Sequence, residues 1–254
     1  MYEYDDNFYT YINEGAAESA RQILPLLLEV LPGPVESVLD VGCGAGAWLS
    51  VWKSLGARVL GLDGDYINTR QLLIELGEFK AADLREGFAL DRQFGLVQSL
   101  EVAEHLPQAS AGKFVENLCQ HSLLVLFSAA TPGQGGENHI NEQSYEYWRK
   151  LFRDQGYSMF DPVRRGVAGR RTVKPWYRYN TFLYASDHCD RAVLDALSPF
   201  RIEPNELAED LAPLAYRLRK QLVRLLPGRV STVLAVVKKT LFRLSLKLRR
   251  QWVR

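Results

Sequence analysis

Apolar residues in the first two thirds of the chain fall into short runs that alternate with stretches of helical spacing. The runs are continuous and rich in Val and Leu, as in strands that are buried on both faces of a sheet. Strands separated by helices predict a doubly wound α/β fold with a mainly parallel sheet. The expected strands are 37–41, 58–62, 79–82, 96–100, 122–128 and 181–185, and the expected helices are 16–31, with an interruption at Pro25, 47–55, 67–76, 113–120, 142–155 and 187–196.

A glycine-rich loop follows the first of these strands. It contains Gly42, Gly44 and Gly46, and glycine lets the backbone approach a ligand closely. In open α/β sheets, ligands bind at the carboxyl ends of the strands, where the strand order reverses. The amides at the start of the next helix would face a bound anion, such as a phosphate or a carboxylate. The loop therefore predicts a cofactor site at this edge of the sheet.

Asp40, two residues before the first glycine, helps to define the cofactor. A pyrophosphate would meet like charge there, whereas the ammonium group of an amino-acid-like cofactor would be attracted. A dinucleotide remains an alternative, because Gly42, Gly44 and Ala47 also fit its fingerprint and Asp63 lies about 20 positions further on.

Four segments, in order, resemble the motifs of class I S-adenosylmethionine-dependent methyltransferases. Residues 38–46 resemble the cofactor-binding motif, 59–65 the second strand, 81–84 the third strand, and 94–107 the fourth strand with the turn after it. The similarity covers about residues 37–186. It implies a Rossmann-like methyltransferase fold with a seven-stranded sheet, and S-adenosyl-L-methionine as the cofactor.

The resemblance implies a role for each acidic residue in these motifs. Asp63 would accept hydrogen bonds from both ribose hydroxyls, which a carboxylate does well. Asp83 and the Leu84 amide would bind the adenine edge, and Asp40 with the glycine backbone would hold the methionine end. The full set of predicted cofactor residues is Asp40, Gly42, Cys43, Gly44, Gly46, Asp63, Gly64, Asp83, Leu84, Ser99 and Leu100.

Catalysis is predicted beside the fourth strand, where the methyl group would emerge. Glu101, Glu104 and His105 lie there, and histidine is the usual general base near neutral pH. Together with His139 they resemble the two-glutamate, two-histidine metal site of the methyltransferases that modify the terminal 2′-hydroxyl of small RNAs. Similar pairs occur in relatives that need no metal, such as the ubiquinone-pathway O-methyltransferases. The expected catalytic set, and the alternative metal set, is Glu101, Glu104, His105 and His139.

Charge is distributed unevenly along the chain. Residues 211–254 hold 12 Lys and Arg and no Asp or Glu, which leaves 19 basic and 30 acidic residues before them. Two amphipathic helices, 211–226 and 230–254, are predicted there on either side of Pro227-Gly228. Their basic faces suit an anionic membrane surface or a protein partner, with nucleic acid less favoured. The expected organisation is an N-terminal cap or helix (1–36), a methyltransferase domain (37–196) and a basic extension (197–254).

Other features restrict location and substrate. Cys43, Cys119 and Cys189 are widely spaced and form no C-x-x-C pair, which indicates a reducing compartment. The acidic, aromatic N-terminus does not resemble a secretory signal, and no run approaches the roughly 18 apolar residues of a membrane span. A cytoplasmic location, peripheral on the inner membrane face, is expected. The basic, aromatic segment 161–179 is expected to be a long connection that contacts the substrate or lies in solvent.

These observations favour O-methylation of a small molecule or of a glycan or lipid-linked sugar. The sugar preference rests on residues 133–143, which resemble bacterial methyltransferases associated with surface polysaccharides. Three alternatives stay open: a metal-assisted RNA 2′-O-methyltransferase, a nicotinamide oxidoreductase, and a module that binds the cofactor without catalysis.

Overall fold

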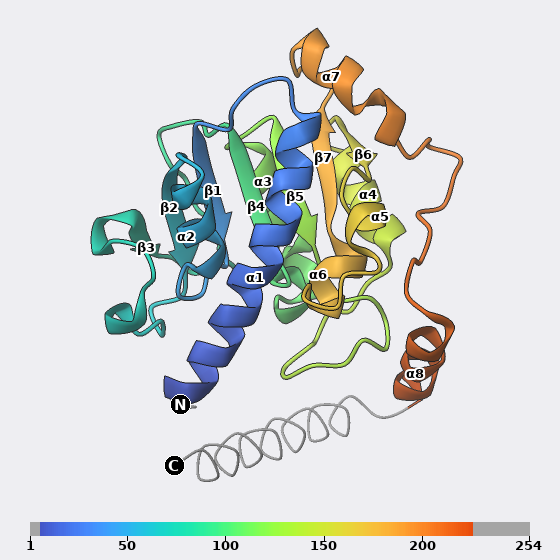
Figure 1. Cartoon of the computed structure of the whole chain (residues 1–254), viewed down its shortest axis with the longest axis horizontal. Coiled ribbons are helices and arrows are strands. Elements are labelled where there is room, and N and C mark those ends of the chain that lie inside the picture. Colours follow the sequence, from blue (N-terminus) through green and yellow to red (C-terminus); the bar gives the residue numbers. More distant parts are fainter. Residues whose placement is uncertain (1–5, 226–254) are drawn as a thin grey trace.

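The computed structural model contains a seven-stranded sheet with strand order β3-β2-β1-β4-β5-β7-β6 (Figure 1). The structure describes the backbone of residues 6–225 and the side chains from residue 13 onward. Pairs among the first five strands of this order are parallel, and β7 is antiparallel to both of its neighbours. The predicted fold is confirmed. The strands are β1 (Ser37–Val41), β2 (Arg58–Asp63), β3 (Phe79–Ala81), β4 (Leu96–Leu100), β5 (Leu124–Ser128), β6 (Tyr157–Phe160) and β7 (Phe182–Ser186).

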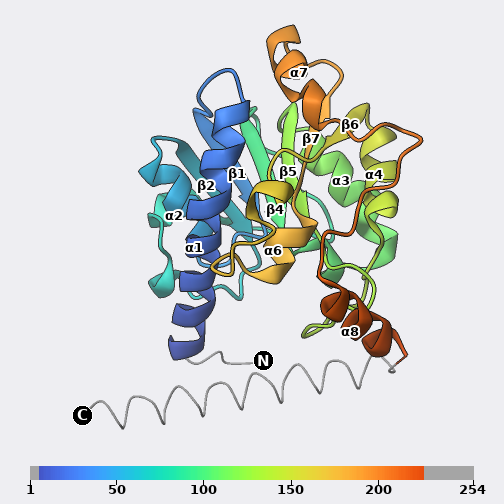
Figure 2. The same ribbon diagram turned by 45° about the vertical axis from the view of Figure 1, so that its right-hand side comes forward.

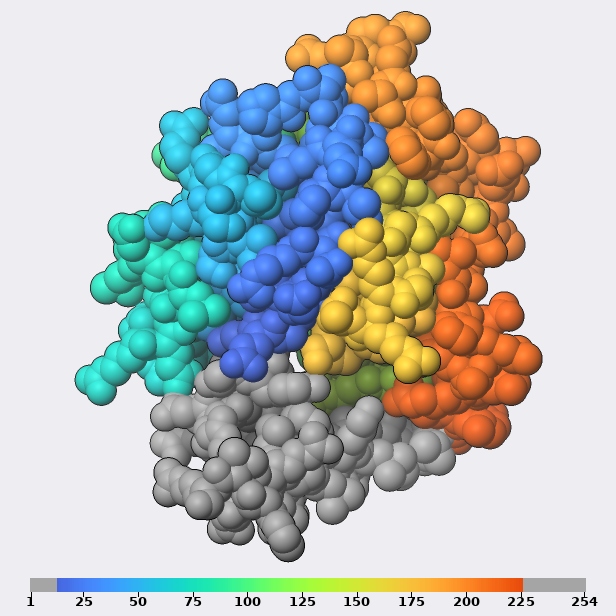
Figure 3. All heavy atoms as spheres, in the orientation of Figure 1, coloured from blue at the N-terminus to red at the C-terminus, as the bar shows by residue number. Residues whose placement is uncertain are grey.

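Helices cover both faces of the sheet (Figures 1 and 2). Because successive strand residues point to opposite faces, Val38 and Leu96 pack with α1 and α2, whereas Leu39 and Val97 pack with α3 and α4. In Figure 3, α1 lies diagonally across its face of the molecule. The helices are α1 (Asp6–Val30), α2 (Ala47–Ser54), α3 (Ala111–Cys119), α4 (Tyr145–Arg153), α5 (Arg164–Val167), α6 (Pro175–Asn180), α7 (Arg191–Leu197) and α8 (Leu214–Arg224).

The helix predicted over 67–76 is wrong. Only two 3₁₀ turns form there, η1 (Thr69–Gln71) and η2 (Leu76–Glu78). The Asn68 side chain accepts a hydrogen bond from the Arg70 amide, which favours a turn. The Leu73 amide then donates to the Ala45 carbonyl in the glycine loop. The segment is therefore held by the glycine loop instead of by helical bonds.

Two further predictions about the chain's path are corrected. α1 continues through Pro25 without the expected interruption. Residues 161–179 are not one long connection, because they contain α5 and most of α6. Pro175 stands in the first turn of α6, where its missing amide costs no helical bond. Of this segment, Arg164 is a core residue and contacts no solvent-filled space.

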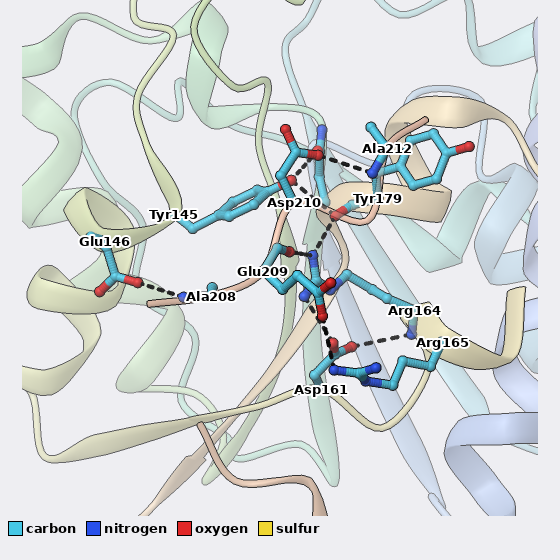
Figure 4. A network of polar contacts seen from close by, with 11 residues as sticks. Tyr145, Glu146, Asp161, Arg164, Arg165, Tyr179, Ala208, Glu209, Asp210 and Ala212 are labelled. Atoms are coloured by element: carbon cyan, nitrogen blue, oxygen red, sulfur yellow. Dashed lines mark hydrogen bonds and ion pairs between the residues drawn. The ribbon is translucent and has the colours of Figure 1, made fainter. Parts of the chain in front are cut away.

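A strap (residues 201–213) connects the core to α8 and is fixed by two buried arginines. Arg149 donates to the main-chain carbonyls of Ile202, Glu203 and Glu206 at 2.5–2.6 Å. Arg164 donates to the Glu209 carbonyl at 2.9 Å and pairs with Asp161 at 2.8 Å (Figure 4). The guanidinium of Arg164 also lies 3.8 Å from the ring centroid of Phe182. The strap is thus bonded chiefly through its backbone.

Among residues 6–225, no helix is both long and apolar enough to cross a membrane. α8 confirms most of the helix predicted over 211–226. The helix predicted over 230–254 lies outside the described residues.

Candidate active site

A cavity of about 830 Å³ opens at the carboxyl ends of β1, β2 and β4. β1 pairs with β2 on one side and with β4 on the other, so the strand order reverses at β1. Ligands bind at such reversals in open α/β sheets. The structure brings eight of the predicted residues to the cavity wall: Gly42, Gly44, Asp63, Gly64, Asp83, Leu84, Glu101 and His105.

The glycine loop is held in a conformation that other residues rarely adopt. Gly42 has φ 86°, and a Cβ added there would lie 2.2 Å from a methyl group of Val102. Gly44 has φ 55°, but a Cβ on it would meet no atom within 4 Å, because this residue borders the cavity. The amides of Gly42 and Cys43 both donate to the Leu62 carbonyl, at 2.7 and 3.1 Å. The loop therefore presents bare backbone to the cavity while β2 anchors it.

Asp63, at the end of β2, is oriented by three donors. Its Oδ2 accepts from the Gly44 amide at 2.7 Å, and its Oδ1 accepts from the Gly64 amide at 2.7 Å and from the Tyr66 hydroxyl at 2.6 Å. An ionised carboxylate has about four acceptor sites, so it can bind further hydroxyls or exchange the exposed Tyr66 for one. This geometry fits the ribose role predicted for Asp63.

Asp40 is buried beneath the glycine loop and does not line the cavity. It lies beside Gln98 in the parallel pairing of β1 and β4, and the Trp52 indole donates to the Gln98 side chain at 2.7 Å. The pKa of Asp40 is raised to about 7. Burial is the main cause, the charge of Asp63 adds to it, and the hydrogen bond with Gln98 opposes the shift. Asp40 therefore changes charge near neutral pH.

Asp83 is placed on the cavity wall with a partner that the sequence reasoning missed. Arg85 donates two hydrogen bonds to the Asp83 carboxylate, from Nε to Oδ1 at 2.9 Å and from Nη2 to Oδ2 at 2.5 Å. This pairing lowers the pKa of Asp83 to about 2. The position of an arginine two residues after the aspartate could have indicated this ion pair from the sequence. A base that binds to Asp83 would have to share it with Arg85.

Besides Asp40, four predicted cofactor residues are absent from the cavity wall. The Ser99 hydroxyl donates to the Val41 carbonyl at 2.8 Å, which ties β4 to β1. Cys43 and Leu100 pack into the hydrophobic core, and Gly46 faces Ile74. The cofactor contacts predicted for these four residues stay predictions.

Glu101 lies in the cavity wall directly after β4, with φ 59°, an uncommon conformation for a residue with a side chain. Its amide donates to the carbonyl and hydroxyl oxygens of Ser128 at 3.0 and 3.1 Å, which offsets the strain. Its carboxylate accepts from Gln134 at 2.7 Å and from Asn180 at 3.3 Å. Burial raises the pKa of Glu101, and these donors oppose the shift.

Gln134 and Asn180 extend this site beyond the predicted residues. The Asn180 amide donates to Gln134 at 2.8 Å, and the Tyr145 hydroxyl donates to Asn180 at 3.1 Å. Gln134 comes from the loop after β5, and Asn180 from the end of α6. Nothing local in the sequence indicates this association, since the two residues are 46 positions apart.

His105 and His139 lie together near the cavity, with ring centroids 4.9 Å apart. His105 is exposed as a residue, and partial shielding of its ring from water, followed by the charge of His139, lowers the pKa of His105 below its usual value, although the Asn138 carbonyl opposes the shift. His105 Nδ1 is 3.2 Å from that carbonyl. His139 Nδ1 is 2.9 Å from Glu142, whose carboxylate also accepts the Gly133 and Gly135 amides.

Glu104 is fully buried, and neither of its carboxylate oxygens has a hydrogen-bond partner among the residues that the structure describes. Burial, followed by repulsion from Glu101, raises the pKa of Glu104 well above its usual value. Ligand atoms of Glu104, His105 and His139 all lie within 4.8 Å of one another. This donor set suits a divalent transition metal. Glu101, the fourth predicted ligand, is instead bonded to Gln134 and Asn180.

Cationic residues of segment 161–179 do not line the cavity. Arg164 is in the core, Arg165 pairs with Glu209, and Arg178 donates to the Val173 carbonyl. The substrate contact expected for segment 161–179 therefore stays a prediction. His121 lies outside the cavity wall, and its ring nitrogens contact the Asn117 carbonyl at 2.6 Å and the Leu90 amide at 3.0 Å.

Comparisons with known proteins agree with this geometry. The family model described as "Methyltransferase domain" matches residues 12–165. Two solved structures share the fold. Streptomyces venezuelae DesVI is 17% identical, with a TM-score of 0.53 over 73% of this chain and 100% of that one. The sugar N-methyltransferase KedS8 from Streptoalloteichus sp. is 16% identical, with a TM-score of 0.56 over 73% and 94%.

A third solved structure of the same fold is the small RNA methyltransferase HEN1. It is 16% identical, with a TM-score of 0.50 over 68% of this chain and 26% of that one. No protein with curated annotation matches the sequence.

Proposed function

The chain belongs to the family of S-adenosylmethionine-dependent methyltransferases, and from this premise we propose that it methylates a hydroxyl group of a small molecule, a glycan or a lipid-linked sugar. Membership of this family decides against the nicotinamide oxidoreductase and against a module without catalysis. The cofactor, when bound, supplies an electrophilic methyl carbon on a positively charged sulfur. The protein must bind and orient the acceptor oxygen and receive its proton.

The neutral His105 ring at the cavity wall carries this proposal. A hydroxyl must lose its proton when its oxygen is methylated, whereas a neutral amine is already nucleophilic. His105 lines the cavity as an exposed residue, and its lowered pKa keeps the ring uncharged at pH 7, so that its free nitrogen can accept a proton from a hydroxyl bound there. Its Nδ1 faces the Asn138 carbonyl, so the tautomer with hydrogen on Nδ1 leaves Nε2 as the acceptor. Glu101, Gln134 and Asn180 add polar groups that suit a hydroxyl-rich acceptor.

Methyl transfer to glycan and lipid-linked saccharide fractions, with tritiated S-adenosylmethionine, tests this proposal. We expect the label in an ether that resists alkaline hydrolysis. Replacing His105 with alanine should reduce transfer by about 100- to 1,000-fold while S-adenosylhomocysteine still binds. The matched control is His188→Ala, which removes an exposed histidine far along the chain. Label found on nitrogen or in an alkali-labile ester would contradict the hydroxyl assignment.

A second candidate, metal-assisted methylation of an RNA 2′-hydroxyl, is favoured by one observation. Within residues 6–225, no group donates a hydrogen bond to the buried Glu104 carboxylate, and the carboxylate lies beside two histidines. A divalent cation there would satisfy Glu104 and lower the pKa of a bound hydroxyl. Glu104, His105 and His139 would hold this ion.

For that candidate we expect one Co²⁺ or Mn²⁺ to bind per chain, and Glu104→Gln to weaken binding by at least about tenfold. Affinity should increase with pH, because the raised pKa of Glu104 means that a proton must leave before the metal binds. The visible absorption of Co²⁺ reports binding without reference to activity. The control is Glu116→Gln, which changes a partly exposed residue of α3. If no ion binds, the metal-assisted candidate is wrong and the metal-free reaction proposed first is kept.

Affinity for S-adenosylmethionine should also depend on pH through Asp40. The pKa of this carboxyl is raised to about 7 by burial, so it is mostly neutral at pH 6 and ionised at pH 8. A cationic ligand favours the ionised form, so binding releases a proton and tightens as pH rises, by about tenfold over this range. Calorimetry at pH 6, 7 and 8 measures the change. Asp40→Asn should abolish this pH dependence. If the affinity of the variant still changed with pH as in the original protein, another group would be responsible.

A further inference from the structure

One face of α8 carries large apolar side chains that point away from the protein. Leu214, Leu218, Leu222 and Leu225 are 63%, 56%, 67% and 81% exposed. They recur at steps of four, four and three residues, which places them along one side of a helix. We call these four residues the leucine face. Such a continuous exposed apolar stripe is a typical interaction surface.

Cations border the leucine face, and acids are absent from it. Arg217 and Arg224 lie along one side of the stripe. The sequence from 211 to 254 contains 12 Lys and Arg and no Asp or Glu, whereas the preceding residues are net acidic. Apolar side chains flanked by arginines are suited to an anionic lipid surface, where the leucines enter the headgroup region and the arginines bind phosphates.

The opposite side of α8 is fixed near Glu101 and Gln134, and on the proposed function this is the acceptor side of the cavity. Lys220 is buried, and its ammonium lies 2.7 Å from Asp210 and 3.3 Å from the Thr131 hydroxyl. Arg219 donates to the main-chain carbonyl of Gln134 at 3.0 Å, and Gln134 in turn binds Glu101. Figures 1 and 2 both show α8 at the same end of the molecule as the loop between β5 and α4. The leucine face is therefore held beside the acceptor site and turned outward.

We propose that the leucine face of α8 docks on an anionic phospholipid surface and thereby holds the acceptor side of the cavity at the membrane. Charge decides between this occupant and a second copy of the chain, because two such helices would bring their arginines together. The chain beyond Leu225 continues the pattern, with eight more Lys and Arg and no acid up to residue 254. Docking does not depend on which acceptor is methylated.

Flotation of the full-length protein with vesicles tests this. We expect binding to vesicles of phosphatidylglycerol and phosphatidylcholine, and little binding to phosphatidylcholine alone. The double variant Leu218→Glu/Leu222→Glu should weaken binding by at least about tenfold. Arg217→Gln/Arg224→Gln should weaken it by about 25-fold, from about fivefold for each cation.

The control is Leu76→Glu, which changes a leucine that is 67% exposed, like Leu222, but lies in η2 away from α8. It should float as the original protein does. S-adenosylhomocysteine binding, measured on every variant, separates loss of docking from loss of folding. Unchanged flotation of the double leucine variant would overturn the proposal, as would equal binding to uncharged vesicles. A dimer in solution that dissociates on the leucine changes would assign this face to self-association instead.

Discussion

Replacing Asp63 with alanine is expected to weaken S-adenosylhomocysteine binding by about 100- to 1,000-fold, or about 3–4 kcal/mol. Two losses add in this variant. The carboxylate that would accept the ribose hydroxyls is removed, and the Gly44 amide loses the bond at 2.7 Å that orients the glycine loop. Calorimetry measures the affinity. Asp63→Asn keeps the size of the side chain and one acceptor oxygen, so its affinity should lie between those of the original protein and of Asp63→Ala.

The control for this prediction is Asp91→Ala, which removes an exposed aspartate outside the cavity wall and should leave affinity unchanged. Thermal unfolding of each variant shows whether the sheet edge is intact. If the Asp63 variant folds and binds as tightly as the original protein, the cofactor does not use this carboxylate. Another residue would then have to bind the ribose hydroxyls.

The second large effect concerns stability. Arg164→Met should lower the free energy of unfolding by about 3–5 kcal/mol, because it breaks a buried ion pair and leaves one charge unpaired. The Arg164 side chain is 1% exposed, and its Asp161 partner is 10% exposed. The variant also removes donors from the carbonyls of Tyr179 and Glu209. Denaturant unfolding followed by circular dichroism measures the change.

Arg165→Met is the matched control, one residue further along α5. Its side chain is 75% exposed, and its pair with Glu209, at 3.0 Å, lies at the surface. Such exposed pairs contribute about 1 kcal/mol or less. Similar losses in both variants would show that the buried network contributes little and that general charge governs the stability of this region.

The parts of the molecule that the sequence predicts well are those with local causes. The buried runs, the glycines after β1 and the aspartate that ends β2 are each specified by neighbouring residues, and all are found where expected. The segment 67–76 misled because its apolar residues fit a helix. Two of them, Leu73 and Leu76, are exposed, since the glycine loop takes the Leu73 amide instead.

Contacts between distant segments were beyond the reach of sequence patterns. Nothing in the sequence around Gln134 or Asn180 marks them as site residues. They reach the site because the loop after β5 and the end of α6 both contact Glu101. Arg164 belongs to segment 161–179, which was expected to contact the substrate or lie in solvent, and it is buried instead. Its burial depends on Asp161, the Phe182 ring and the strap, which the fold assembles from three separate segments.

The bonds that fix the strap have a consequence for how this protein can vary. Arg149 and Arg164 grip carbonyl oxygens, which every amino acid possesses, so relatives could change most side chains between residues 202 and 209 and keep the same path. Insertions and deletions would not be tolerated in the same way, since they would shift the carbonyls out of register with the two guanidinium groups. In a collection of related sequences, this segment should therefore vary in composition but keep its length.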